Sequence, residues 1–254
     1  MGKQNYGEDL QLNLLGKFTL IMKSRIFENK IALVVGASGG IGSALIKKLK
    51  KEKVVVIESS ISQSRYKLDI SSSRQIEALA KEIENEFNNI DFLFNASGIA
   101  YYKTLTETSI DEINKVIKIN LIGAIELTQK FIPLMNNGGT IVHLGSMAGI
   151  CKGHKYFSVY SASKEGLAGF LRSVSAEFPG INFILVTPAG VNTNIARKAI
   201  GGVSLLKKFR ESYSNLDTPA DIATGILNNI EHKDRDVRIF PTKLSKETYD
   251  ELRK

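Results

Sequence analysis

The sequence predicts a single-domain α/β fold, a doubly wound parallel sheet with helices on both faces. Two observations support this prediction. Apolar runs without polar alternation recur along the chain, as in strands covered on both sides, and apolar stripes at helical spacing separate them. Strands that alternate with helices from end to end are typical of doubly wound folds. No interdomain linker is visible in the 254 residues, so we expect one domain over residues 28–254.

Residues 1–27 precede the first strand signal, and we expect an N-terminal extension there. Leu10, Leu14 and Phe18 recur at helical spacing in this segment. Three alternatives remain open. The start codon could be assigned too early, with Met22 as the natural start, or the segment could form a helix that caps a neighbouring subunit or lies on a membrane surface.

The strand and helix signals then follow in order. The runs "KIALVVGASGG" and "EKVVVIESS" predict two buried strands, the first of which breaks into glycines. Four further apolar runs are strand candidates: "IDFLFNAS", "GTIVHLGS", "INFILVTP" and "VRIFP". Two apolar helical stripes lie between the strands, at Ile76, Leu79, Ala80, Ile83 and Phe87 and at Leu167, Phe170, Leu171, Val174 and Phe178.

Composition argues against several classes of protein. The single cysteine, Cys151, excludes an internal disulfide framework, and the three histidines form no cluster with metal-ligand spacing, so we expect a metal-free mechanism. The net charge is +8, but the lysine run between 47 and 53 lacks the aromatic residues of a nucleic-acid surface, so we expect no nucleic-acid partner. No segment reaches the length of a membrane span and no secretory leader pattern is present. We therefore expect a cytoplasmic protein without integral membrane association.

The first strand runs into "GASGGIG", Gly36 to Gly42, and we expect a helix to begin near Ser43. Glycines let the backbone approach a pyrophosphate, which the N–H groups at a helix N-terminus attract. Glu58 follows Gly36 by roughly 20 residues, the spacing of an acid that binds the adenosine ribose. Together these features predict a dinucleotide site at the end of the first strand.

Tyr160 and Lys164 lie four residues apart in "VYSASKEGLAGF", and on a helix they would share one face. A free tyrosine, with a pKa of about 10, is a poor base at neutral pH, and a neighbouring cation lowers that pKa. We therefore expect Lys164 to lower the pKa of Tyr160 and prepare it for proton transfer. Alone, this spacing is a weak signal, because ordinary surface helices contain it often.

Six ordered motifs make residues 28 to 230 resemble the short-chain dehydrogenase/reductase family. The motifs are the glycine cluster Gly36, Gly40 and Gly42, "NASG" from Asn95 to Gly98, "INLIG" around Asn120, "LGSMAG" with Ser146, "YSASK" with Tyr160 and Lys164, and "PAGVNT" ending at Thr193. The resemblance implies a Rossmann-type fold. It also implies an NAD(P)-dependent oxidoreductase that acts on a small-molecule secondary alcohol or ketone.

The resemblance implies a role for each residue of a catalytic tetrad. Tyr160 would be the general acid/base, and Lys164 would also hold the nicotinamide ribose. Ser146 would hydrogen-bond the substrate oxygen, and Asn120 would support a water relay to the lysine. Taken singly, Ser146 could be a turn residue and Asn120 a hydrogen-bonding residue inside a helix.

Cofactor contacts are implied in the same way. Thr193 would meet the nicotinamide carboxamide and Asp69 the adenine, with helix-cap or turn roles as the alternatives. Asp69 follows Glu58 so closely that the helix which usually intervenes must be missing or very short. The full predicted set is Gly36, Ser38, Gly40, Ile41, Gly42, Glu58, Asp69, Ile70, Asn95, Ala96, Gly98, Tyr160, Lys164, Pro188, Val191 and Thr193.

The chain departs from the family pattern at three places. Val35 replaces the usual threonine, Ala96 and Ser97 replace the usual Asn-Ala, and Ala189 replaces a glycine. None of these changes removes a catalytic side chain. Gly39 also permits the glycine spacing of the longer epimerase-like branch, which generally needs a larger C-terminal substrate region than this chain has.

Glu58 predicts a preference for NAD over NADP, because a carboxylate can bind both ribose hydroxyls but repels a 2′-phosphate. Relatives that prefer NADP often carry a basic residue where this chain has Gly39 or Ser59. Arg65 or Lys53 could still supply a cation here. The alternative is that Glu58 is a solvated residue at the end of its strand.

The sequence also carries predictions about assembly and about access of the substrate. Gly166, Ala168 and Gly169 form a small-residue face opposite the apolar stripe of their helix, so we expect a homodimer or homotetramer, as the resemblance also suggests. Residues 194–215 are expected to form a lid over the substrate. The substrate itself is not identifiable from these residues.

Two alternative functions remain. The first is a 3-oxoacyl-[acyl-carrier-protein] reductase, although that group usually ends in an Asp-Gly-Gly-like tail, whereas this chain ends "DVRIFPTKLSKETYDELRK". The second is a non-catalytic nucleotide-sensing scaffold protein, which would be free to lose Tyr160 or Lys164. Both residues are present.

Overall fold

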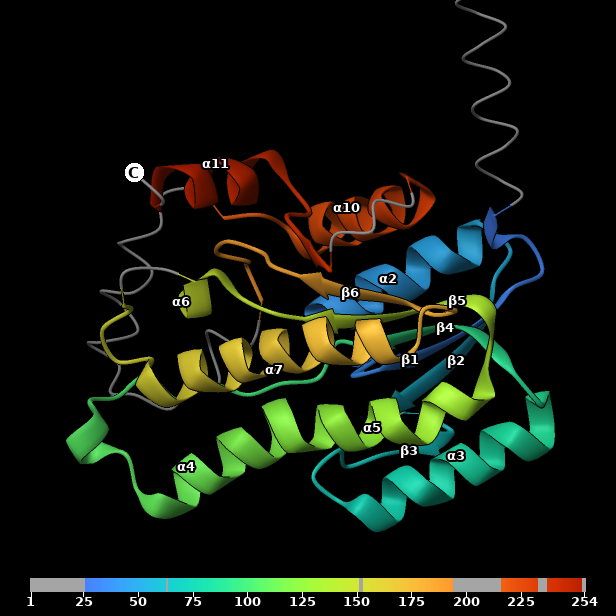
Figure 1. Ribbon diagram of the computed structural model, residues 1–254, viewed down its shortest axis with the longest axis horizontal. Helices are drawn as coiled ribbons and strands as arrows, with labels where there is room; N and C mark the ends of the chain where they lie inside the picture. Colours follow the sequence, from blue (N-terminus) through green and yellow to red (C-terminus); the bar gives the residue numbers. More distant parts are fainter. Residues whose placement is uncertain (1–25, 63, 151–152, 194–215, 233–236, 253–254) are drawn as a thin grey trace, which may run out of the picture.

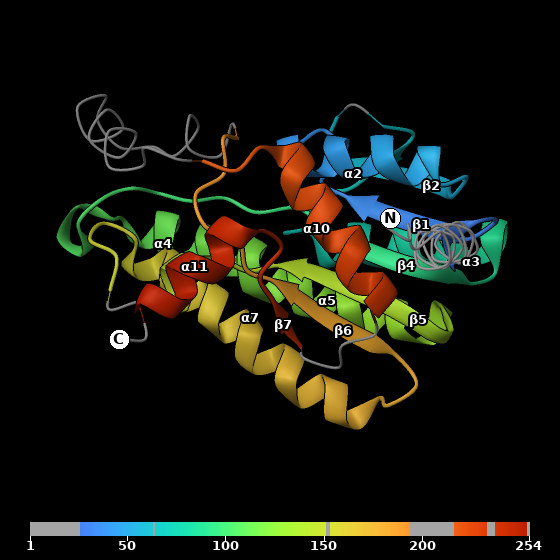
Figure 2. The ribbon, with the colours of Figure 1, turned by 90° about the horizontal axis from the view of Figure 1, so that it is seen from above.

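A seven-stranded parallel sheet in the order β3-β2-β1-β4-β5-β6-β7 forms the centre of the protein (Figures 1 and 2). The strands are β1 Ile31–Val35, β2 Val55–Ser60, β3 Tyr66–Lys67, β4 Ile90–Asn95, β5 Met135–Leu144, β6 Asn182–Val186 and β7 Arg238–Ile239. The computed structural model describes residues 26–62, 64–150, 153–193, 216–232 and 237–252. The predicted doubly wound α/β fold is confirmed.

Helices cover both faces of the sheet, as Figure 2 shows. Against one face pack α2 (Gly40–Lys51) and α10 (Pro219–His232). Against the other pack α3 (Ser73–Phe87), α5 (Gly123–Phe131) and α7 (Ser158–Glu177), with α4 (Ile110–Ile117) continuing into α5 through the π-helical turn η2 (Lys118–Ile122). The shorter elements are η1 Leu105–Glu107, η3 Ile132–Leu134, α6 Met147–Ile150 and α11 Lys243–Leu252.

All six predicted strands are present, and two boundaries differ from expectation. The helix after the glycine cluster begins at Gly40 rather than near Ser43. Strand β5 begins at Met135, four residues before the predicted run. The pair Tyr66–Lys67 was not predicted as a strand, because two residues carry no periodic signal and only pairing with β2 defines them.

Both predicted helical stripes face the core. In α3, Ile76, Leu79, Ala80 and Ile83 are buried, and the Ser72 side chain caps the helix by accepting the Gln75 N–H. In α7, Leu167, Leu171 and Val174 are buried. Phe178, at the end of that stripe, is 37% exposed, because the helix ends there and the chain turns toward β6.

The predicted small-residue face of α7 is wrong. Ala168 is only 1% exposed and belongs to the hydrophobic core, not to an open face. A Cβ on Gly166 would lie 2.9 Å from the Leu121 side chain, so this glycine packs against η2 of the same chain. The error arose because the burial of α7 extends further around the helix than its apolar residues indicate.

The carboxyl ends of the parallel strands meet along one edge of the sheet, where the predicted motifs follow their strands. The strand order reverses between β1 and β4, which is where open α/β sheets bind ligands. The predicted lid at 194–215 and nearly all of the predicted extension lie outside the described residues. Within the described part of the chain, no helix combines the length and apolar character needed to cross a membrane.

Candidate active site

Tyr160 and Lys164 lie in the first turns of α7 and meet on one side of the helix, as their spacing predicts. The Lys164 ammonium nitrogen is 5.7 Å from the centroid of the Tyr160 ring. Lys164 is 4% exposed and donates a hydrogen bond of 2.7 Å to the Leu144 carbonyl, at the carboxyl end of β5. One of its three N–H donors is thereby used within the fold.

Burial governs the charge states of this pair. It lowers the pKa of Lys164 to about 8 and raises the pKa of Tyr160, although a hydrogen bond with Ser146 acts against the second shift. Tyr160 as a whole residue is partly exposed, and desolvation of its phenol is the largest cause of the shift. We expected Lys164 to lower the pKa of Tyr160. The net shift is upward in the folded chain because desolvation of the phenolate outweighs its favourable interactions.

Ser146 follows β5, and its hydroxyl makes two contacts, one of which is the turn contact named as its alternative role. Its Oγ accepts the Ala148 N–H at 3.1 Å, which is a turn contact before α6. The same hydroxyl also bonds to Tyr160. The structure therefore places Ser146 at the tyrosine hydroxyl, where it can also contact a substrate oxygen.

Asn120 is buried in the π-helical turn η2, a type of irregularity that is frequent at functional sites. Its amide exchanges two hydrogen bonds of 2.9 Å with the backbone of Ile99 and donates to Ser163 Oγ at 3.1 Å. A Cβ on Gly98 would lie 3.4 Å from Asn120 Oδ1 and 3.6 Å from Lys164 Nζ. Asn120 and Lys164 therefore border the same small space at Gly98.

The glycine cluster has the shape that a bound pyrophosphate requires. Gly36 has a φ of +81°, and a Cβ there would lie 2.8 Å from the backbone of Ser97. A Cβ on Gly42 would collide with the Gly36 carbonyl. No side chain of the described residues caps the N-terminus of α2, so its first N–H groups can bind an anion. These residues fit a dinucleotide phosphate.

The rest of this loop is open toward the same edge of the sheet. Ser38 is exposed and Ile41 is half-buried against the apolar core. A Cβ on Gly40 would lie 3.2 Å from Thr193 Cγ2, so the glycine cluster and the "PAGVNT" segment are neighbours. Thr193 donates its N–H to the Val191 carbonyl at 2.8 Å, and Val191 forms an isolated bridge with residue 217.

Glu58 lies on β2 opposite Val34, but the strand continues for two residues beyond it. Its carboxylate forms an ion pair of 2.7 Å with Lys50 of α2. The cations considered from the sequence pair elsewhere, Arg65 with Glu86 and Lys53 with Glu28. Lys50 was missed, and its only signal is its place in the last turn of a helix that packs beside β2.

Asp69 makes the turn contact named as its alternative role, and its contact with adenine stays a prediction. Its carboxylate accepts the N–H and the hydroxyl of Ser71, at 2.9 and 2.7 Å. As predicted, no helix lies between β2 and Asp69 among the residues described there. Ile70 is buried, and its carbonyl lies so close to Gly123 that a Cβ would collide with it.

The remaining predicted residues line the same edge with their backbones. Asn95 is buried, and its side chain contacts Ser97 and the ring of His143. Ala96 donates its N–H to the Val35 carbonyl at 2.8 Å, and Pro188 accepts from the Met147 N–H at 3.2 Å. Backbone hydrogen bonds thus join the segment after β4 to the end of β1, and the segment after β5 to that after β6.

An aromatic cluster from two separate parts of the sequence lies beside Tyr160. The Phe157 ring lies 5.4 Å from Tyr160, and the Tyr102 ring lies 4.9 Å from Phe157 and 5.0 Å from Tyr156. Tyr102 comes from the loop after β4, far away in the sequence. The aromatic pair at 101 and 102, directly after a predicted strand end, was the signal that could have identified it.

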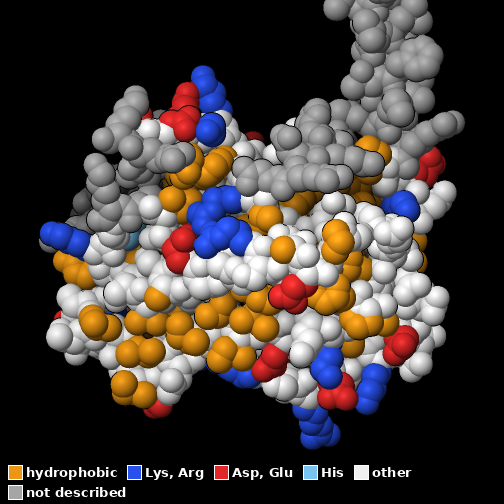
Figure 3. Space-filling view, viewed as in Figure 1, with side chains coloured by type: hydrophobic (Ala, Val, Ile, Leu, Met, Phe, Trp, Pro, Cys, Tyr) orange, Lys and Arg blue, Asp and Glu red, His pale blue; other side chains and the backbone are white. Residues whose placement is uncertain are grey.

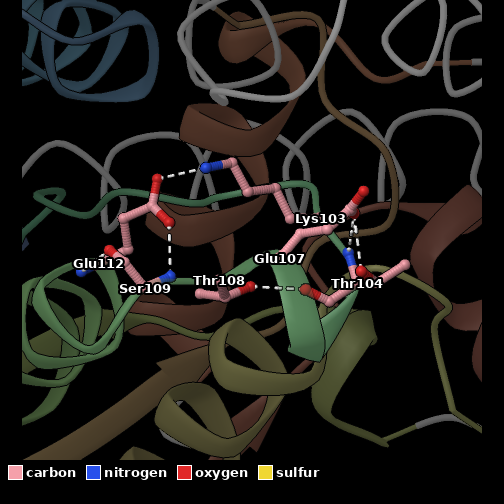
Figure 4. A network of polar contacts seen from close by, with 6 residues as sticks. All are labelled: Lys103, Thr104, Glu107, Thr108, Ser109 and Glu112. Atoms are coloured by element: carbon pink, nitrogen blue, oxygen red, sulfur yellow. Dashed lines mark hydrogen bonds and ion pairs between the residues drawn. The ribbon is translucent and has the colours of Figure 1, made fainter.

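A polar network fixes the loop that carries Tyr102 (Figure 4). Lys103 forms an ion pair of 2.6 Å with Glu112 of α4, and its N–H donates to the Tyr156 carbonyl at 3.1 Å. Thr104 donates to Glu107 at 2.7 Å in a capping box at η1. The loop is therefore anchored directly after Tyr102, to α4 and to the segment before α7.

Comparisons with known proteins agree with this geometry. A family described as "short chain dehydrogenase" matches residues 30–201. Carbonyl reductase family member 4 of Xenopus laevis is 34% identical over 184 residues, covering 66% of this chain and 78% of the relative. The 3-oxoacyl-[acyl-carrier-protein] reductase FabG of Salmonella typhimurium is 32% identical over 189 residues, covering 67% and 77%.

Solved structures share the architecture. Aldohexose dehydrogenase of Thermoplasma acidophilum, in ligand-free form, aligns with a TM-score of 0.70 and 26% identity, covering 79% of this chain and 86% of that chain. A short-chain dehydrogenase/reductase of Burkholderia phymatum in complex with NAD aligns with a TM-score of 0.77, covering 88% and 92%. At 22% identity the second likeness concerns the fold alone.

Proposed function

The chain belongs to the short-chain dehydrogenase/reductase family, and from this premise we propose that it transfers a hydride between nicotinamide and a secondary alcohol or ketone. One observation carries the proposal: the buried Lys164 ammonium lies beside Tyr160, whose hydroxyl bonds to Ser146. A proton must move at the substrate oxygen when a hydride moves at the carbon, and this arrangement supplies a group for it.

Tyr160 gives its proton to the carbonyl oxygen in reduction and takes the proton back in oxidation. Ser146 orients that oxygen through its hydroxyl. When bound, the nicotinamide supplies or accepts the hydride. Lys164, with its pKa near 8, is mostly charged at neutral pH, and its cation favours the phenolate form once the site is occupied.

Lys164 also has two N–H donors beyond the one that Leu144 accepts, and we assign them to the nicotinamide ribose. Asn120 is the fourth member of the tetrad. Because it borders the same space as the ammonium at Gly98, it is placed to support a water-mediated proton path to Lys164.

The cofactor is held along the edge where the strand loops meet. The Gly36–Gly42 segment and the N-terminus of α2 take the pyrophosphate, because the glycines of this segment let the backbone approach it closely. Glu58 takes the adenosine ribose and favours NAD over NADP. Its ion pair with Lys50 is largely exposed, so the carboxylate can exchange this partner for ribose hydroxyls at little cost.

We propose a homo-oligomer as the working form. Hydrophobic side chains form a band over α4, α5 and α7 on the face shown in Figure 3. On the described surface, Ile110 is 69% exposed, Ile122 39% and Phe178 37%. Exposed apolar groups gathered on one face are typical of subunit contacts. Light scattering at micromolar concentration tests this, and a monomer alone would contradict it.

A 3-oxoacyl-[acyl-carrier-protein] reductase is the second candidate, favoured by the similarity to FabG. The two candidates differ in the substrate that must bind beside Tyr160. Turnover of acetoacetyl thioesters well above that of simple ketones would favour the second candidate. Turnover of ketones alone would favour the first.

The central test measures oxidation of NADH and NADPH with a panel of ketones, for the wild type and for Tyr160→Phe. The variant lacks only the hydroxyl, so we expect it to fold and bind cofactor while kcat falls by about 10²- to 10⁴-fold. Thermal shifts with each cofactor provide the control for binding. Turnover by Tyr160→Phe at the wild-type rate would refute the mechanism.

A further inference from the structure

His143 lies at the centre of a buried polar chain to which the proposed reaction assigns no role. It stands on β5 opposite Asn95 of β4, and its side chain is fully buried. Its Nδ1 is 3.1 Å from Asn95 Nδ2, and its Nε2 is 2.8 Å from Thr128 Oγ1 in α5. A polar side chain in an apolar strand is costly unless it is satisfied, and here both ring nitrogens have partners.

Backbone groups at the two ends of this chain decide where each proton lies. The Ser97 N–H can only donate, so it fixes Asn95 Oδ1 as its acceptor at 3.1 Å and turns Asn95 Nδ2 toward the ring. His143 Nδ1 therefore accepts, and the ring proton lies on Nε2, which donates to Thr128. Thr128 Oγ1 in turn donates to the Ala124 carbonyl at 2.8 Å.

This series of hydrogen bonds requires that the His143 imidazole be neutral. Burial, together with the charge of Lys164, lowers the pKa of His143 to about 3. A proton on Nδ1 would face the amide donor of Asn95 and break that contact. His143 is therefore a fixed acceptor and donor at working pH, and it does not shuttle protons.

The Ser97–Gly98 turn, at one end of this series of hydrogen bonds, lies against two parts of the proposed site. A Cβ on Gly36 would lie 2.8 Å from the Ser97 nitrogen, so the turn packs directly on the glycine cluster. A Cβ on Gly98 would lie 3.6 Å from Lys164 Nζ. A rotated Asn95 amide would release the Ser97 N–H and allow the turn to shift against both.

We infer that His143 is a positioning residue: by accepting from Asn95 Nδ2 it stabilises the amide orientation in which Asn95 Oδ1 accepts from Ser97, and it thereby helps to hold the Ser97–Gly98 turn in place for the cofactor. The inference rests on the proposed function, since it assumes that a nicotinamide cofactor binds beside this turn. In this inference His143 does not touch the cofactor and acts on the site through its contact with Asn95.

Two matched variants separate the two ends of the chain. His143→Asn places an amide oxygen near the position of Nδ1, so it retains an acceptor for Asn95 but does not reach Thr128. His143→Gln places its amide near the position of Nε2, so it reaches Thr128 but leaves Asn95 without its acceptor. Thr128→Val removes only the Thr128 end and is the control.

We expect His143→Gln to raise the cofactor KM about tenfold, with kcat at saturation within about threefold and the KM for the carbonyl substrate unchanged. His143→Asn and Thr128→Val should keep the cofactor KM within about twofold, although both lose thermal stability. Equal cofactor KM values for the Asn and Gln variants would overturn the inference, because a merely structural histidine would affect only stability.

Amide hydrogen exchange at Ser97 provides a readout that does not depend on turnover. Exchange should be faster in His143→Gln than in His143→Asn or Thr128→Val, and equal rates would overturn the inference. A wild-type protein that exchanges as expected but turns over no carbonyl compound would refute the proposed function instead. The two failures are therefore distinguishable.

Discussion

Lys50 and Lys164 both lie near the proposed cofactor, yet their surroundings are opposite. Lys50 is at the surface, with a side chain 58% exposed and a carboxylate partner, Glu58, at 2.7 Å. Lys164 is 4% exposed, and among the described residues its hydrogen-bond acceptor is a neutral carbonyl, that of Leu144. Burial lowers the pKa of Lys164 strongly, to about 8.

The difference shows what burial adds to a charge. An exposed ion pair interacts through water of high dielectric constant and contributes little. A buried ammonium without a counter-ion retains its desolvation cost, and a ligand that approaches it meets a field that solvent does not screen. The exposed lysine is therefore replaceable, whereas the buried one is costly to keep and useful for chemistry.

The largest expected effect separates the two lysines by activity. Lys164→Ala should lower kcat/KM by at least about 100-fold and weaken cofactor binding, because it removes both the cation beside Tyr160 and the ribose donors. Lys50→Ala should remain within about threefold of the wild type. Steady-state kinetics and cofactor titration measure both variants, and similar losses in the two would contradict the comparison.

Replacing Lys164 should lower activity but raise the stability of the fold. Lys164→Met should raise the free energy of unfolding by roughly 1–3 kcal/mol at pH 7, since it removes a buried charge that has no acidic partner among the described residues. Because the folded pKa is about 8 and the ordinary value is 10.5, the unfolded wild type binds more protons between these values. Wild-type stability therefore rises with pH in this window relative to the variant.

Urea denaturation at pH 7 and pH 9.5 checks this sign. The gap between Lys164→Met and the wild type should narrow at the higher pH, where the lysine loses its charge. A gap that widens, or a variant less stable than the wild type at pH 7, would show that the hydrogen bond to Leu144 outweighs the desolvation cost.

The choice between NAD and NADP tests the role of the exposed ion pair between Lys50 and Glu58. We expect the wild type to prefer NAD at least tenfold in kcat/KM, about 1.4 kcal/mol, because Glu58 repels a 2′-phosphate. Glu58→Ala should reduce or reverse this preference, since it also frees Lys50 for a phosphate. Glu58→Asp, which keeps the charge, is the control, and equal use of both cofactors by the wild type would contradict the assignment.

The smallest effect is the contribution of the exposed pair to stability. Lys50→Met should change the free energy of unfolding by no more than about 0.5 kcal/mol, as is usual for surface ion pairs. Thermal denaturation at low and high salt measures it. A loss above about 1 kcal/mol would mean that the pair is structural and that ribose cannot displace it cheaply.

Most of the fold was predictable from local patterns. Six strands and both apolar stripes followed from residue spacing, because buried parallel strands and amphipathic helices have periods that a sequence displays. The strand Tyr66–Lys67 was not predictable, since its pairing with β2 alone defines it. The face of α7 was misjudged because Gly166 is covered by Leu121, a contact between separate elements.

The residues of the candidate site were predictable from their motifs, but their burial and their contacts with other elements were not. Tyr160 and Lys164 meet as their spacing requires, yet the upward shift in the pKa of Tyr160 depends on burial, which no local pattern specifies. Lys50 reaches Glu58, and His143 reaches Asn95, only through the packing of separate elements. Local sequence patterns do not specify such contacts between separate elements.

The wholly parallel sheet has a consequence for how the protein is made. Neighbouring strands run parallel and none is joined by a tight hairpin. Apart from β2 and β3, which lie close together in the sequence, each pairing therefore waits for a long connection to be synthesised and packed. β1 gains both neighbours only after the ribosome has passed Asn95, and β7 adds only after Arg238. We therefore expect slow folding compared with helical bundles, with apolar strands exposed to chaperones while the chain emerges.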